Sequence, residues 1–86
     1  MSARVKLPDP LDKLLRSELE KAIYKAALDQ DDDLIAQRYI VEKKLQIDIA
    51  AELGWERSTV SRHIPYILDE VERAASRITK LKGVGG

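Results

Sequence analysis

Apolar residues recur every three or four positions along most of this chain, which is the spacing of amphipathic helices. The clearest run covers residues 10 to about 28 and predicts one helix with its charges on the outer face. A second helix is predicted to begin at Asp32 or Asp33 and to end at Val41, before a turn at residues 42–44. The apolar positions of these two helices are Leu11, Leu14, Leu15, Leu19, Ala22, Ile23, Ala26, Leu34, Ile35 and Tyr39.

The stretch at residues 46–65 has the spacing of a helix-turn-helix. Ala50 is small where a second helix would cross closely, and Gly54 accepts the left-handed backbone that ends the first helix. Val60 would pack against the first helix, and Ile49, Leu53 and Trp55 supply the other apolar contacts around the corner. The residues predicted to build the motif are therefore Ala50, Leu53, Gly54, Trp55 and Val60.

Polar side chains occupy the positions that such a motif leaves exposed. Arg57 and Arg62 are each able to form two hydrogen bonds to a guanine, a contact worth about 1–3 kcal/mol of discrimination. The hydroxyl groups between them would contact phosphate or bases, or would cap the helix. Gln46 would direct its amide at a phosphate, and the lysines of the preceding turn would add backbone affinity or serve solubility alone. The predicted DNA-binding residues are Lys43, Lys44, Gln46, Arg57, Ser58, Thr59, Ser61 and Arg62.

The helix-turn-helix region resembles that of bacterial sigma factors, in the part that reads the upstream promoter element. Residues 38–54 read RYIVEKKLQIDIAAELG and resemble the entry to the family's motif, and residues 58–64 read STVSRHI and resemble its recognition helix. Small phage and bacterial regulators share this module, and the resemblance covers residues 32 to about 68. It implies a sequence-specific, DNA-binding regulator of transcription, with double-stranded DNA and RNA polymerase as candidate partners.

Pro65 bears on the length of the recognition helix. Because proline removes a backbone hydrogen bond and its ring clashes with the preceding turn, a straight helix through it would cost about 3 kcal/mol or more. We therefore predict a kink or a break, within an all-α fold of four to five helices. Beyond it, residues 67, 71, 74, 78 and 81 form an apolar heptad stripe. This stripe is either a homodimer seam through residues 67–81 or a surface that folds back on the N-terminal helix.

The length of 86 residues and the composition limit the domain organisation, the metal sites and the location expected for this protein. This length predicts one domain at residues 10–82, with a flexible arm at residues 1–9 and a disordered tail at residues 83–86. The absence of cysteine excludes disulfides and thiolate metal sites and indicates the cytoplasm, and the single histidine argues against zinc. No apolar run approaches the roughly 20 residues that span a bilayer, so no membrane partner is expected.

Charge weakens the DNA-binding prediction, because the formal net charge is zero and phosphate neutralisation supplies most nonspecific affinity for DNA. The distribution of charge partly supports the prediction. Residues 1–54 carry nine basic and eleven acidic residues, whereas residues 55–86 carry six basic and four acidic residues. Much of the acidic excess comes from Asp29 and residues 31–33, which are best read as a helix start that complements the helix dipole. A metal site there is the less favoured interpretation, since the residues lack the EF-hand pattern.

Two aromatic residues invite functional interpretations that the sequence does not favour. His63 follows Ser61 closely, but nothing indicates a pocket that would exclude water, so we expect no enzyme activity and no cofactor. Trp55 could stack on a base, but its position in the motif favours apolar packing at the corner. The alternatives to a DNA-binding regulator are a phage packaging or recombination adaptor with the same module, and a protein-interaction module that binds RNA polymerase or another regulator.

Overall fold

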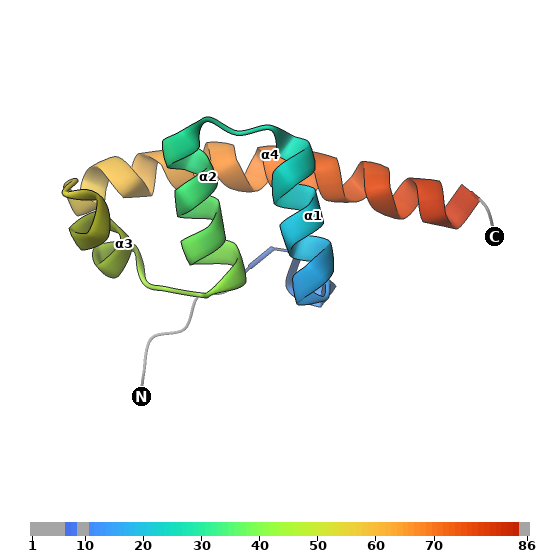
Figure 1. The fold of residues 1–86 in the computed structure, drawn as a ribbon, viewed down its shortest axis with the longest axis horizontal. Coiled ribbons are helices and arrows are strands. Elements are labelled where there is room, and N and C mark those ends of the chain that lie inside the picture. Colours follow the sequence, from blue (N-terminus) through green and yellow to red (C-terminus); the bar gives the residue numbers. More distant parts are fainter. Residues whose placement is uncertain (1–6, 9–10, 85–86) are drawn as a thin grey trace.

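The described part of the chain consists of four α-helices and two short helical segments and contains no strand (Figure 1). The computed structural model describes residues 7–8 and 11–84, including side chains up to residue 78. The predicted all-α class with four to five helices is confirmed. In chain order the elements are the 3₁₀ helix η1 (Leu11–Lys13), α1 (Arg16–Ala26), α2 (Gln30–Ala36), the π-helical segment η2 (Gln37–Val41), α3 (Gln46–Leu53) and α4 (Arg57–Val84).

The N-terminal helix is shorter than its apolar periodicity predicts. Instead of one helix from residue 10, η1 ends at Lys13 and the backbone is extended at Leu15 before α1 begins. The carboxylate of Glu18 accepts a hydrogen bond from the Leu15 N–H at 2.9 Å, which fixes this start in the manner of half a capping box. The prediction of a single helix over residues 10–28 was therefore wrong at its N-terminal end.

The described residues of the predicted N-terminal arm, Leu7 and Pro8, contact the rest of the domain. Leu7 is only 5% exposed and belongs to the hydrophobic core. The carbonyl of Pro8 accepts a hydrogen bond from the Asp12 N–H at 3.1 Å. Residue 7 is thus part of the packed domain rather than of a flexible arm, and residues 1–6 and 9–10 lie outside the described residues.

The second helix begins at Gln30, two residues before the earliest predicted start, and residues 31–33 place three aspartates in its first turn. Acidic groups at this end interact favourably with the helix dipole. The helix continues without interruption into η2 and closes where Lys43 takes a left-handed backbone, with φ +59°. The Lys44 N–H donates to the Arg38 carbonyl at 2.8 Å across this end. The turn predicted at residues 42–44 is present.

The corner between α3 and α4 has the backbone that the helix-turn-helix spacing predicts. Gly54 ends α3 with φ +72°, and the Trp55 N–H donates to the Ala50 carbonyl at 2.9 Å. Ala50 is 4% exposed and Val60 is fully buried, so the two helices meet closely at these residues. Leu53 and Trp55 pack against the core from partly buried positions. An alanine in place of Gly54 would meet no neighbour but would be strained by the backbone conformation.

Helix α4 runs through Pro65 without a break, so the predicted alternative of a broken helix was wrong. The reason is the side of the helix on which the proline lies. Pro65 and Ser61 are both exposed, so the side of the helix that lacks the backbone hydrogen bond is open to water, which can replace the bond. Ile64 and Ile67, on the opposite side, are buried in the core and hold the helix in place. Since α4 extends to Val84, it also enters the predicted tail at residues 83–86.

Helix α4 crosses α1, α2 and α3 and supplies one wall of the core along its whole packed length (Figure 1). The first three positions of the apolar heptad stripe, Ile67, Val71 and Ala74, are at most 1% exposed and belong to the core that includes Leu19, Ala22 and Ile23 of α1. The interpretation that the stripe folds back within one chain holds for them. They are not free to form the homodimer seam considered for residues 67–81, and the side chain of Leu81 lies outside the described residues.

Candidate nucleic-acid interface

The first two turns of α4 present one continuous polar face to solvent. Arg57, Ser58, Ser61 and Arg62 are all exposed, because positions one, four and five residues apart lie on one side of a helix. The opposite side carries Val60 and Ile64, which the core buries. The structure therefore brings together four of the five residues predicted on this helix. The fifth is Thr59, which is partly buried and is turned toward α2.

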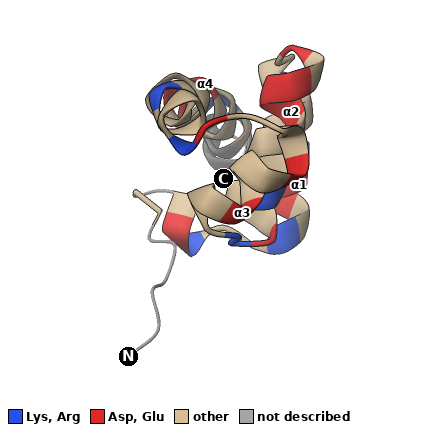
Figure 2. Cartoon of the chain, turned by 90° about the vertical axis from the view of Figure 1, so that its left-hand side faces the viewer, with Lys and Arg blue, Asp and Glu red and all other residues tan. Residues whose placement is uncertain are grey.

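The two arginines of this face are free of ion pairs within the described part of the chain. An acidic residue, Glu56, lies directly before α4 and is also exposed. In Figure 2, which views the molecule from the α3 end, blue segments on the first turns of α4 border a red segment of the loop that leads into it. The face is thus locally basic within a surface of mixed sign.

The predicted residues before and at the start of α3 are partly engaged within the chain. The Lys43 ammonium donates to the Ile40 carbonyl at 3.1 Å and so caps the end of its own helix. Lys44 lies 3.7 Å from a carboxylate oxygen of Glu42, at an exposed site where such a pair is weak. Gln46 is the first residue of α3 and is partly buried. These three residues form a second polar group, on a different element from the α4 face.

A clamp around Arg38 fixes α3 relative to the preceding helix. The Arg38 Nε donates to both carboxylate oxygens of Glu52, at 3.1 and 3.0 Å, and its Nη1 donates to Glu42 at 2.8 Å. The hydrogen bond from Arg38 lowers the pKa of the Glu52 carboxyl below its ordinary value, and the same bond raises the pKa of the Arg38 guanidinium. The helical i,i+4 spacing of Arg38 and Glu42 is a local signal for half of this clamp, but nothing local indicates Glu52.

A second contact ties α4 to α2. Asp32 is the one charged residue in the described part of the chain that is buried, at 8% exposure, and its Oδ1 lies 2.7 Å from the Nδ1 of His63. An ionised carboxylate only accepts hydrogen bonds, so Nδ1 carries the proton. The Trp55 ring lies against the same imidazole, with ring centroids 5.1 Å apart. Three segments, the start of α2, the corner and α4, therefore meet at His63, a contact that the sequence did not predict.

Replacing either partner of the Asp32–His63 hydrogen bond tests how this contact stabilises the domain. His63→Leu keeps an apolar contact for Trp55 but leaves the largely buried Asp32 carboxylate without its donor, so we expect the free energy of unfolding to fall by about 1–3 kcal/mol. Asp32→Asn keeps an oxygen that accepts the Nδ1–H bond, so the expected loss is under about 1 kcal/mol. Urea unfolding of both variants measures the difference. An Asp32→Asn loss that equals or exceeds the His63→Leu loss would contradict this account.

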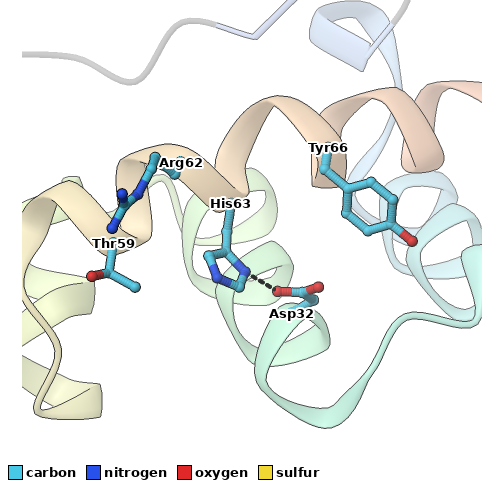
Figure 3. Close-up of a pocket in the computed structure, with 5 residues that line it drawn as sticks. All are labelled: Asp32, Thr59, Arg62, His63 and Tyr66. Atoms are coloured by element: carbon cyan, nitrogen blue, oxygen red, sulfur yellow. Dashed lines mark hydrogen bonds and ion pairs between the residues drawn. The ribbon is translucent and has the colours of Figure 1, made fainter.

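An open pocket lies between α2 and α4, beside the polar face at the start of α4 (Figure 3). Its volume is about 450 Å³, and its lining residues are Asp32, Thr59, Arg62, His63 and Tyr66. Tyr66 is 57% exposed and was not predicted as a site residue. Within the residues that the structure describes, no group of three or more metal-ligating side chains lies together, so the aspartates at the start of α2 do not form one.

Comparisons with protein-family models, with curated proteins and with solved structures find no match to this chain. Among the described residues, no helix combines the length and the apolar character that a membrane span requires. Any function proposed for the protein therefore rests on the chain's own residues and on the geometry of the α4 face.

Proposed function

We propose that this protein binds double-stranded DNA in a sequence-specific manner through α4 and acts as a small regulator of transcription. The observation that carries the proposal is the outward face of the first two turns of α4, where two arginines without an ion-pair partner among the described residues and two serines lie above a buried apolar side. A major groove about 12 Å wide admits such a helix. The face begins directly after the corner that follows α3, as in a helix-turn-helix.

The two arginines of this face would have different roles. Arg57 is exposed on the first turn of α4, beside Ser58, where a side chain meets the base edges at the floor of the groove. Arg62 lines the pocket beside α2 and points toward Thr59, at the flank of the same helix (Figure 3). In the proposed complex Arg57 reads a base, and Arg62 contacts the sugar-phosphate backbone, which fixes the position of the helix in the groove.

A specific observation favours protein docking as the second candidate. Ile47 is 60% exposed and Leu45 is 37% exposed, and they lie at the start of α3, on the helix-turn-helix itself. Apolar side chains at such a site suit a protein partner, with RNA polymerase or another regulator as the partner classes considered above. The neutral net charge of the chain also favours this candidate.

The salt dependence of duplex binding separates the two functions. Purified protein is titrated against a fluorescent random-sequence duplex pool, the affinity is measured by anisotropy between low and moderate salt, and the bound fraction is sequenced. If about three cations meet phosphates, the logarithm of the affinity should fall against the logarithm of salt concentration with a slope of about −3, and one sequence should be enriched. No duplex binding at the lowest salt concentration would exclude DNA binding and leave protein docking as the function of this surface.

A further inference from the structure

The pocket between α2 and α4 has hydrogen-bond donors at both ends. The Arg62 side chain extends toward Thr59 on one side of His63, and the Tyr66 ring extends to the other side of His63 (Figure 3). Arg62 has no ion-pair partner among the described residues, and Tyr66 exposes more than half of its surface. A guanidinium, a threonine hydroxyl and a phenol hydroxyl therefore border one open depression of about 450 Å³.

The one acidic group of this pocket is already engaged. Asp32 contributes the only carboxylate of the lining, and its side chain is 12% exposed. Its Oδ1 accepts the hydrogen bond from His63 at 2.7 Å, so the carboxylate is directed at the imidazole. The donors that remain available to a ligand are the Arg62 guanidinium and the hydroxyls of Thr59 and Tyr66, and a ligand rich in acceptor oxygens suits them.

The continuity of α4 through Pro65 decides where Tyr66 lies. Tyr66 follows Arg62 by four residues, so in one unbroken helix the two side chains lie on the same side, one turn apart. A break at Pro65 would have removed this register. The donors are thus arranged along the helix axis, next to the face that carries Arg57 and Ser58. This elongated arrangement suits a run of linked phosphates better than a single ion.

We propose that the pocket between α2 and α4 holds the sugar-phosphate backbone of one DNA strand, with Arg62 at one end and Tyr66 at the other. This inference rests on the proposed DNA binding by α4. The Tyr66 hydroxyl donates a hydrogen bond to a phosphate oxygen, and the Tyr66 ring packs against the adjoining sugar. Its role is to position the reading face, because phosphate contacts set the register of a helix in the groove and carry no sequence information.

The test compares two exposed tyrosines that lie on different helices. Tyr66→Phe removes the hydroxyl from the pocket, and Tyr24→Phe removes it from α1, where the side chain is 80% exposed. The probe is a fluorescent duplex of the sequence enriched in the selection, together with a random duplex. We expect Tyr66→Phe to weaken binding to both duplexes by the same factor, about three- to tenfold, and Tyr24→Phe to leave both affinities unchanged.

Methylphosphonate substitution then locates the contact on the DNA. Each phosphate of the enriched duplex is replaced in turn by a neutral methylphosphonate, and affinities are measured for the wild-type protein and for Tyr66→Phe. At one position the methylphosphonate should lower the affinity of the wild-type protein more than that of Tyr66→Phe, because the two substitutions remove the same contact. The inference would be overturned if the effects of the methylphosphonate and of Tyr66→Phe on binding free energy were additive at every position. It would also be overturned if Tyr66→Phe bound the duplex as tightly as the wild-type protein.

Two further outcomes separate the possible failures. If the wild-type protein binds no duplex at low salt, the proposed function fails and the inference fails with it. If the wild-type protein binds DNA while Tyr66→Phe binds equally well, only the assignment of the pocket is wrong. Titration with inorganic phosphate, monitored through the NMR signals of the Tyr66 ring, tests whether the pocket binds a free phosphate ion instead of the DNA backbone. Saturable shifts without DNA would identify a site for a free anion and overturn the assignment to the DNA backbone.

Discussion

Ile67→Ala is expected to lower the free energy of unfolding by about 2–5 kcal/mol, the range for an isoleucine truncated in a close-packed core. Ile67 is 1% exposed, on the side of α4 that faces the other helices. Its truncation removes buried apolar surface and leaves a cavity that the backbone of one long helix cannot easily close. Domains of this length are stable by only about 4–13 kcal/mol, so this loss is a large fraction of the total free energy of unfolding.

Urea unfolding followed by circular dichroism measures this loss, with Leu15→Ala as the control. Leu15 is 67% exposed, and its truncation should change the free energy of unfolding by no more than about 0.5 kcal/mol. The transition midpoint of the wild-type protein should not depend on protein concentration, because Ile67 packs within its own chain. A midpoint that rises with concentration would show that folding is coupled to association, as a homodimer seam through residues 67–81 requires.

The features that the sequence predicted well are those with a local cause. The corner between α3 and α4 depends on the small side chain of Ala50, the left-handed backbone of Gly54 and the apolar side chain of Val60, all within eleven residues. Each requirement is steric and acts between neighbours in the sequence. The spacing alone was therefore sufficient to predict where α3 ends and where the next helix begins.

The contacts that the sequence did not predict join residues far apart in the chain. His63 was considered with its neighbours in sequence, whereas its partner Asp32 lies 31 positions earlier. The aspartates at residues 31–33 were interpreted together as a helix start, and nothing in the pattern distinguishes the one that is buried. Glu52 likewise meets Arg38 across 14 positions. Which charges pair depends on how the helices cross, and periodicity does not contain that information.

Pro65 shows how tertiary packing overrides a local rule. The intrinsic cost of an internal proline left a kink and a break as alternatives, and the buried residues on either side of Pro65 keep α4 in one helix, so the break does not occur. The open alternative of a break at Pro65 also hid Tyr66, since a residue after a break has no fixed register with Arg62. The sequence thus predicted the four exposed residues on the first two turns of α4 but not the pocket that continues along the helix.

The different surroundings of the two arginines lead to different expected binding defects. Arg57→Ala should weaken binding to the enriched duplex by about 1–3 kcal/mol, roughly five- to 150-fold, and relax selection at one base position. Its affinity for random duplex should change far less, because base contacts distinguish sequences. The measurement is the same anisotropy titration on both duplexes, with sequencing of the pool that the variant selects.

Arg62→Ala should instead weaken binding to enriched and random duplexes by a similar factor, and make the slope of log affinity against log salt less negative by about 1. The reason is its place beside the pocket, where the proposed contact is a phosphate. Arg77→Ala is the matched control, since Arg77 is an exposed arginine of the same helix far from the corner. If Arg62→Ala relaxed sequence selection and left the salt slope unchanged, Arg62 would be a base reader. Equal losses in Arg77→Ala would show that general charge, rather than the face at the start of α4, drives binding.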